Sequence, residues 1–347
     1  MITLKDIAVK AGVSIETVSR VLNGKNKEVW PSAVRRADAI RRIAKKAGFR
    51  PNFAAKTMRK GRFNQIACVV TRFEAGEGGR DLDRGYLEAA TVALAEHGYS
   101  AIFEPFVLDW RTMDILGSPK LFSELAVDGI LGISEAGVNL RHIDAKFAHL
   151  GSPAVWINRD VVPGVPCVVA DELANAKKIT RYFITQGHRR IGYVGYQVGP
   201  YSVRERNQGV REALEEAGLD TSHVVIKNLT DTVPTMIRAY FDEHRDMTAI
   251  VGYSGQFYDS ITHEMMLRGI RLHHDLDVGY FGMPSGAVME FPVVILEIPK
   301  QRMATEAVKI LIQRIEGEAI GAAVKPIPGD LYVGGVGGPV RVEDVVK

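Results

Sequence analysis

The chain has 347 residues, of which 46% are hydrophobic, so it can bury a large core and is too long for a single average domain. No stretch reaches the roughly 18 to 20 consecutive apolar residues of a membrane span, and the N-terminal MITLKDIAVK lacks the apolar run of a signal peptide. This excludes membrane and secreted classes and predicts a cytoplasmic protein without a membrane partner.

The net charge of +3 conceals an asymmetry, because residues 1–62 carry 16 Lys and Arg against four Asp and Glu, whereas the remainder carries 28 against 37. A basic unit before an acidic one indicates that the first binds a polyanion; a solvated basic surface without a partner is the alternative.

Two short helices are predicted close together near the N-terminus. Apolar residues recur at helical spacing over residues 4–11, after the capping residue Thr3 and before Gly12. Ser14 is a good cap for a second amphipathic run over residues 15–22. Two helices this short, joined by a glycine-containing turn in a basic segment, are typical of a helix-turn-helix. A third amphipathic helix is predicted over residues 32–46, and the three together can close a small core.

The segments TLKDIAVKAGVSIETVSRVLNG and AGFRPNFAAKTMRKGR resemble the LacI/GalR family of transcription regulators. The resemblance implies that Ile15 and Glu16, at the start of the second helix, and Arg20, one turn later, face base edges in the major groove. It also implies phosphate contacts or helix-capping roles for Thr3, Ser14, Thr17, Ser19 and Asn23. Simple helix packing is the alternative for Thr17, and for Val18 we prefer packing.

Residues 51–62 follow, and Pro51-Asn52 opens the segment FAAKTMRKGR. Its helix-forming residues make only about two turns, too few for an isolated helix in water. In the family this segment is a hinge helix that forms on DNA, pairs with its dimer mate in the minor groove and wedges an apolar side chain between bases. The resemblance assigns the wedge to Met58, where the family usually has Leu, and the same face to Asn52, Ala55 and Lys56. A plain basic linker is the alternative.

The chain departs from the family in the stretch Gly24–Pro31, GKNKEVWP, which is longer than the family loop between the second and third helices. Trp30 has no family counterpart. It is either an added core residue or an extra contact with the DNA backbone, and both interpretations stay open.

From Gln65 onward, short β-branched runs alternate with amphipathic helical stretches, which predicts an α/β fold with parallel sheets. The segments QGHRRIGYVG, ERNQGVREALEEAGL and EIPKQRMATEAVKIL also resemble the LacI/GalR family, more loosely. They imply a periplasmic-binding-protein-like domain, in which the chain crosses three times between two doubly wound lobes that enclose a ligand cleft. Strands are predicted to begin near Ile66, Gly129, Ala154, Ile191, Ala249 and Val293, and helices to cover residues 84–97, 173–186, 205–217 and 301–316.

The predicted organisation is therefore an all-α helix-turn-helix headpiece followed by a two-lobed α/β domain. The expected boundaries are 1–50 for the headpiece, 51–62 for the hinge, 63–347 for the effector-binding and dimerisation domain, about 63–161 and 293–322 for lobe 1, and about 162–292 and 323–347 for lobe 2.

The resemblance also implies effector contacts. Arg206, three residues before Gly209, matches the arginine that hydrogen-bonds effector hydroxyls or carboxylates, and Ser202 stands one turn earlier. The other implied contacts are Phe73, which would pack on a ligand ring, and the strand-end polar residues Asn158, Ser254 and Gln256. A surface or packing role is the alternative for each.

The sequence Tyr280-Phe281-Gly282 departs from the family, which usually has Gly-Phe-Asp with the aspartate facing the ligand. Gly282 lacks that acceptor, and we expect it to leave room for a larger or differently oriented effector. A sugar or sugar derivative is still expected, because five aromatic residues offer stacking surfaces, although core packing explains them equally well. They are Trp110, Trp156, Tyr196, Tyr201 and Tyr253.

Two other classes of protein fit the sequence less well. An enzyme is disfavoured because GxSxG, HExxH and Walker patterns are missing, and the glycine cluster Gly334–Gly338 precedes no helix. We expect no catalytic residues, cofactor or metal site: His273-His274-Asp275 is interpreted as a loop, and Cys68 and Cys167 as core residues. A solute-binding protein would lack the basic headpiece. The sequence therefore predicts a homodimeric repressor that binds a pseudo-palindromic operator under allosteric control by a small effector.

Overall fold

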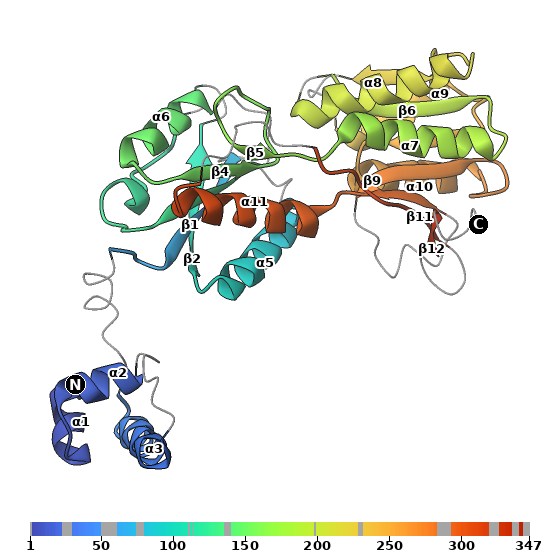
Figure 1. Ribbon diagram of the computed structural model, residues 1–347. Helices are drawn as coiled ribbons and strands as arrows, with labels where there is room; N and C mark the ends of the chain where they lie inside the picture. Colours follow the sequence, from blue (N-terminus) through green and yellow to red (C-terminus); the bar gives the residue numbers. More distant parts are fainter. Residues whose placement is uncertain are drawn as a thin grey trace. The chain divides into compact units, whose positions relative to one another are not determined.

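The computed structural model describes residues 2–22, 30–49, 61–73, 80–109, 112, 114–134, 140–197, 199–227, 232–282, 293–318, 326–334 and 340–342. The chain divides into two compact units, Met1–Phe63 and Asn64–Lys347 (Figure 1). Among the described helices, none combines the length and apolar character needed to cross a membrane.

The first unit consists of the helices α1 (Leu4–Ala11), α2 (Ile15–Leu22) and α3 (Pro31–Lys46). At the start of α1, Thr3 Oγ1 accepts from Asp6 N (3.3 Å) while the Asp6 carboxylate accepts from Thr3 N (2.8 Å), a reciprocal capping box. Gly12 ends α1 in the left-handed conformation, with φ 63°, which a residue without Cβ adopts at no steric cost. The buried side chains of this small core are Ile7, Ala8, Val18, Val21, Ala37, Ile40 and Ala44.

Trp30 precedes α3 and is 74% exposed. Its carbonyl accepts from Ala33 N (2.9 Å) and Val34 N (3.0 Å), and Pro31 follows at the first helical position. The interpretation of Trp30 as an added core residue is therefore wrong, because its extended backbone starts the helix with the indole directed to the surface. A contact with DNA stays a prediction. Residues 24–29 of the same loop lie outside the described part of the chain.

The second unit contains two sheets. The first has the order β2-β1-β3-β4-β5 and is parallel throughout. Its strands are β1 (Gln65–Phe73), β2 (Ser100–Leu108), β3 (Gly129–Ser134), β4 (Ala154–Ile157) and β5 (Cys167–Val168). The helices of this lobe are α5 (Arg80–Glu96), α6 (Arg141–Leu150) and α11 (Lys300–Ile315), with a short 3₁₀ helix at Lys120–Phe122. Figure 1 shows α11 beside α5, although more than 200 residues separate them in the sequence.

The second sheet has the order β12-β11-β10-β9-β8-β6-β7, in which β11 and β12 are antiparallel to their neighbours and the rest are parallel. Its strands are β6 (Ile191–Tyr196), β7 (Val224–Lys227), β8 (Ala249–Gly252), β9 (Asp277–Gly282), β10 (Val294–Glu297), β11 (Leu331–Val333) and β12 (Val340–Arg341). The helices are α7 (Glu172–Thr185), α8 (Tyr201–Glu216), α9 (Val233–Glu243) and α10 (Gly255–Arg268). The predicted fold class, a helical headpiece and a two-sheet α/β domain, is confirmed.

The boundaries of the lobes differ from the expected ones. β5 pairs with β4 in the first sheet, although residues after 161 were expected in lobe 2. β10 pairs with β9 and β11 in the second sheet, although it was expected in lobe 1 with α11. The chain changes lobes after these strands rather than before them. The physical reason is that an apolar run reports burial but not which of two buried sheets it joins.

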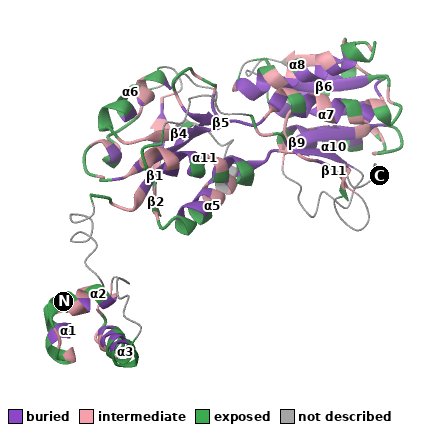
Figure 2. Cartoon of the chain, viewed as in Figure 1, coloured by how far each residue is buried: buried purple, intermediate pink, exposed green. Residues whose placement is uncertain are grey.

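The central strands are buried at nearly every position, so both faces of the sheets are covered (Figure 2). In β8, Val251 packs with Ile179 and Phe183 of α7, whereas Ile250 packs with Ile237 and Ile261 of α9 and α10. Cys68 and Cys167 are buried and unpaired, as predicted, and burial raises the pKa of each thiol to about 12.

Candidate functional site

The second helix of the headpiece is held by a cap at one end and by a buried face. Ser14 Oγ accepts from Thr17 N (3.2 Å) and lies 3.1 Å from Thr17 Oγ1. Val18 and Val21 are buried against α1 and α3, which confirms the preferred packing interpretation of Val18. The half-buried Thr17 is engaged in this cap, so its local role is structural.

The opposite face of α2 exposes three side chains of different chemistry. Ile15 is 44% exposed, and Glu16 and Arg20 are exposed as well. Hydrogen bonds from the Glu16 backbone and from Ser14 lower the pKa of Glu16, so its carboxylate stays ionised. The helix therefore presents an apolar group, an acceptor and a cation on one accessible surface.

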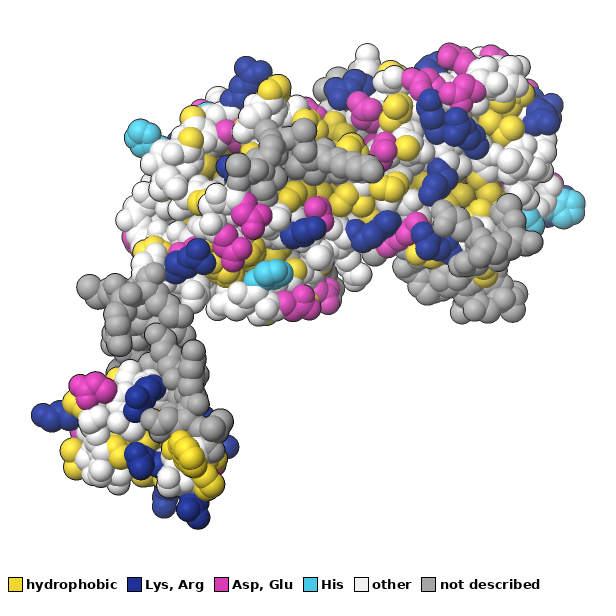
Figure 3. Space-filling model, in the orientation of Figure 1, with side chains coloured by type: hydrophobic (Ala, Val, Ile, Leu, Met, Phe, Trp, Pro, Cys, Tyr) yellow, Lys and Arg dark blue, Asp and Glu magenta, His cyan; other side chains and the backbone are white. Residues whose placement is uncertain are grey.

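Basic side chains predominate on the first unit. Figure 3 shows more Lys and Arg than acidic surface on its visible face. Thr3 is exposed at the start of α1, and Ser19 is half-buried on α2. The remaining residues predicted to contact DNA lie outside the described part of the chain: Asn23, Asn52, Ala55, Lys56 and Met58.

The residues predicted to contact an effector follow strand ends or lie on α8. Asn158 follows β4 in the left-handed conformation, with φ 59°, which asparagine tolerates better than most residues. Its Nδ2 donates to the carbonyl of Ser134 (3.0 Å), and its Oδ1 accepts from the hydroxyl of Tyr201 (3.5 Å). The Tyr201 hydroxyl also accepts from Ala170 N (3.1 Å). A residue of lobe 1 and one of lobe 2 are thus joined at a point where the chain crosses.

Arg206 is buried and bound to a carboxylate that the sequence did not single out. Its Nε and Nη2 donate to Glu172 Oε2 and Oε1 at 2.8 and 2.7 Å, and its Nη1 donates to the carbonyl of Tyr253 at 2.6 Å. The guanidinium carbon lies 4.8 Å from the ring centre of Tyr253 and 4.3 Å from that of Phe281. Burial alone would lower the pKa of Arg206, but the carboxylate of Glu172 more than offsets this and raises it.

Ser202 joins this cluster, because its Oγ lies 2.8 Å from the hydroxyl of Tyr253. Ser254 precedes α10 without a side-chain capping bond, and Gln256 is exposed in the first turn of that helix. Ser202 and Arg206 are thus connected through Tyr253, whereas Asn158 is bonded to Tyr201, and Gln256 has no described contact with either group. Phe73 ends β1, and its side chain lies outside the described part of the structure.

The expectation that Gly282 leaves room for a ligand is wrong. A Cβ built at Gly282 would lie 2.8 Å from Cε2 of Tyr280, so the Tyr280 ring already fills the space beside it. The Gly282 carbonyl also accepts from Ile298 N (3.0 Å). The reason is local: Tyr280 lies two residues before Gly282 in the same strand, so its bulky side chain points to the face that a side chain at position 282 would occupy.

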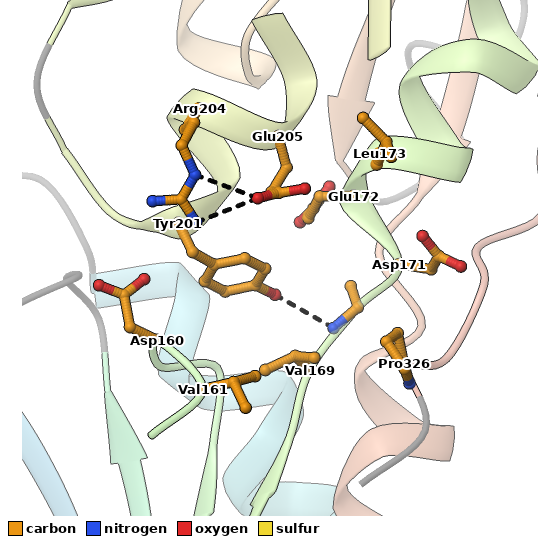
Figure 4. Close-up of a pocket in the computed structure, with 11 residues that line it drawn as sticks. Asp160, Val161, Val169, Asp171, Glu172, Leu173, Tyr201, Arg204, Glu205 and Pro326 are labelled. Atoms are coloured by element: carbon orange, nitrogen blue, oxygen red, sulfur yellow. Dashed lines mark hydrogen bonds and ion pairs between the residues drawn. The ribbon is translucent and has the colours of Figure 1, made fainter. Parts of the chain in front are cut away.

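A cavity of about 440 Å³ lies beside this cluster (Figure 4). In Figure 4, Tyr201 and the bound pair of Arg204 and Glu205 come from α8, and Asp160 lies across the cavity. None of the six predicted effector residues that the structure fully describes lines it. Its lining residues are Asp160, Val161, Val169, Ala170, Asp171, Glu172, Leu173, Tyr201, Arg204, Glu205 and Pro326.

Sequence reasoning missed Glu172, Asp160 and Glu205. Glu172 follows Asp171, whose side chain caps α7, and a glutamate in the first turn of a helix is normally explained by the helix dipole alone. Only the burial of Arg206 shows that a counter-ion is needed, and the sequence does not identify it.

Comparison with known proteins gives consistent matches over both units. Residues 3–52 match the family model of the bacterial regulatory proteins, lacI family. Residues 180–335 match the family model of the periplasmic binding protein-like domain. The HTH-type transcriptional regulator CelR of Thermobifida fusca is 29% identical over 332 residues, 91% of this chain and 92% of its own. A ribose operon repressor of Halalkalibacterium halodurans is 23% identical, covering 96% of each chain.

Solved structures match over nearly the whole chain. A complex of the transcriptional regulator CelR with cellobiose superposes with a TM-score of 0.64 and 26% identity, covering 98% of this chain and 99% of that one. The lac repressor dimer bound to operator and the anti-inducer ONPF has a TM-score of 0.73 at 16% identity, covering 98% of each chain, and shows the shared fold.

Proposed function

Because this chain belongs to the LacI family of bacterial regulatory proteins, we propose that it is a repressor that binds a pseudo-palindromic operator as a homodimer and responds to a small effector. The relatives named as transcription regulators align over more than nine-tenths of the chain, which supports this function for the whole molecule.

The exposed face of α2 carries the DNA-binding part of the proposal. An α-helix fits the major groove of B-DNA, and Arg donates two bonds to guanine, while an isoleucine can contact the methyl group of thymine. Arg20 and Ile15 lie on the accessible side of a helix whose other side is fixed in a core. Two headpieces of a dimer would then read two half-sites in opposite directions.

We assign the effector to the region around Ser202 and Arg206. Ligands of doubly wound folds bind beyond the carboxyl ends of the strands. The polar groups described above either follow β4 and β8 or lie on α8, the helix that comes after β6. CelR has been solved with cellobiose, so this disaccharide is the first ligand to test. The Tyr201 hydroxyl bonds to Asn158 of lobe 1 and to Ala170, which lies in the segment that crosses from β5 to α7. These bonds support a route by which an effector between the lobes alters their arrangement.

The decisive experiment is selection of operator sequences from random duplexes by the purified full-length chain, followed by titration of the selected DNA. We expect enrichment of an inverted repeat and a change in operator affinity on addition of effector. Absence of any enriched sequence would overturn the DNA-binding function. Enrichment with no response to a panel of neutral and charged sugars would overturn the proposed effector class.

A further inference from the structure

The guanidinium of Arg206 is neutralised within the chain. Glu172 accepts from both Nε and Nη2, and the side chains of Arg206 and Glu172 are only 8% and 2% exposed. Two parallel bonds between a guanidinium and a carboxylate give the strongest geometry for such a pair. The position that a ligand carboxylate or phosphate would occupy on this edge of Arg206 is filled by the side chain of Glu172.

Displacing Glu172 is strongly unfavourable. A carboxylate at 2% exposure that loses its partner is left charged and unpaired, which is far more costly than the pair itself. The Tyr253 and Phe281 rings, which lie against the guanidinium, make its surroundings poorly polar and hold it in position. An anionic ligand would therefore meet Glu172 in place and be repelled by it.

Neutral acceptors face no such penalty. In the described part of the chain, the bonds of Arg206 use one N–H on each of its three nitrogens. A guanidinium carries five donors, so one remains on Nη1 and one on Nη2. A hydroxyl oxygen can accept from these without displacing the carboxylate.

The charges that line the adjacent cavity also disfavour an anionic ligand. Glu172 also lines it, together with Asp160, Asp171 and Glu205; among the described lining residues the one cation is Arg204, which is itself bound to Glu205 at 3.0 Å. Asp160 Oδ1 is buried and has no hydrogen-bond partner among the described residues. These walls offer acceptors and negative charge to whatever enters, which favours a ligand that donates hydroxyl groups.

We propose that Glu172 is a specificity-determining residue that restricts the effector to polyhydroxylated molecules without negative charge and excludes sugar phosphates, sugar acids and other anions. This inference rests on the assignment of the effector to the region around Arg206 made above. It narrows that assignment, because an arginine alone suits carboxylate and hydroxyl oxygens equally.

The first test uses a small anion that needs no knowledge of the effector. Thermal unfolding of the full-length chain is measured in sodium sulfate and in sodium chloride of equal ionic strength. Glu172→Gln keeps the size of the side chain and removes its charge, so Arg206 should bind sulfate. The rise in the unfolding midpoint from chloride to sulfate should then be several degrees larger in this variant than in wild type. This difference should vanish in the double variant Glu172→Gln with Arg206→Gln.

Asp160→Asn is the matched control, because it removes one carboxylate from the same cavity without taking a hydrogen-bond partner from an arginine in the described part of the chain. We expect it to respond to sulfate as wild type does. If Glu172→Gln does not fold, Glu172→Asp is used instead, because it keeps the charge but shortens the side chain. It should show a smaller sulfate-dependent rise of the unfolding midpoint, which again depends on Arg206. A sulfate response of wild type that depends on Arg206, or no gain in either Glu172 variant, overturns the proposal.

A second test compares neutral sugars with their anionic derivatives. Wild type is titrated with cellobiose and cellobionate, glucose and glucose 6-phosphate, and galactose and galacturonate. The neutral member of a binding pair should bind at least tenfold more tightly, and Glu172→Gln should reduce that ratio. An anion that binds as tightly as its neutral partner overturns the role of Glu172. If no sugar binds, the sugar-effector function fails, and the sulfate measurement still decides what Glu172 does.

Discussion

Arg20 is the residue whose replacement separates base recognition from general attraction to DNA. It is exposed on α2 on the face that carries Ile15 and Glu16. Arg20→Ala should weaken binding to the best operator by about 1 to 3 kcal/mol and relax the preference at one base pair. Competition gel shifts against single-base variants of the selected operator measure both effects.

Arg20→Lys is the control for charge. Lysine keeps the cation but not the planar fork that binds two acceptors of a base. We expect this variant to retain binding to random DNA while losing much of the discrimination. Wild-type selectivity in either variant would remove Arg20 from the base-reading role.

At the scale of single elements, the capping box of α1 predicts a dependence on pH. Hydrogen bonds from the Thr3 backbone and side chain hold the pKa of Asp6 below its ordinary value near 3.8, with smaller contributions from Lys10 and Lys5. A carboxyl group with a lowered folded-state pKa stabilises the fold fully above its unfolded-state value. This stabilisation is lost as the pH falls below about 3.8 and through the folded-state pKa.

Hydrogen exchange of the α1 amides in the full-length chain at pH 7 and pH 3 measures this effect. Asp6→Asn should reduce protection at pH 7 and remove part of its pH dependence, and Thr3→Ala should cost roughly 1 kcal/mol as the loss of an N-cap. Equal protection of wild type and Asp6→Asn at pH 7 would show that the box does not stabilise the helix.

The packing of α8 against α7 depends on Gly209. A Cβ at this position would lie 2.5 Å from the carbonyl oxygen of Leu173 and 2.7 Å from Cβ of Ala176. Gly209→Ala should therefore lower the free energy of unfolding by about 1 to 3 kcal/mol through overpacking. Gly255→Ala is the matched control, because its Cβ would meet only Cε2 of Tyr280 at 3.8 Å and should be neutral or stabilising. Equal thermal midpoints for the two variants would contradict the close approach of the helices.

Over the whole molecule, operator and effector should influence each other equally. If the effector changes operator affinity by a given factor, the operator must change effector affinity by the same factor, typically about 5- to 150-fold. Ser202→Ala tests this better than Arg206→Ala, because the latter leaves Glu172 buried without its partner. We expect Ser202→Ala to weaken effector binding in calorimetry and to leave effector-free operator affinity unchanged. A ligand that binds with no effect on operator affinity would contradict the coupling.

The headpiece could be predicted closely from the sequence, because its helices are set by local signals. The caps Thr3 and Ser14, the terminating Gly12 and the spacing of Val18 and Val21 all act within a few residues of one another. Six strands of the second unit, β1, β3, β4, β6, β8 and β10, were found for the same reason, since apolar runs report burial directly. The other six strands in the described part of the chain were missed: β2 lies at the edge of its sheet and is only partly buried, β5, β11 and β12 are two or three residues long, and VVIK of β7 and DVGYFG of β9 were not assigned.

The tertiary structure alone decided the charge of the candidate effector site and the sheet that β10 joins. Glu172 and Arg206 are 34 positions apart, and the packing of α7 on α8 brings them together. Tyr280 fills the space beside Gly282 in a way that residue types do not reveal. Sequence patterns record whether a side chain is buried and how a helix begins, because these depend on near neighbours. Which buried groups meet depends on how whole elements pack, and only the tertiary structure shows it.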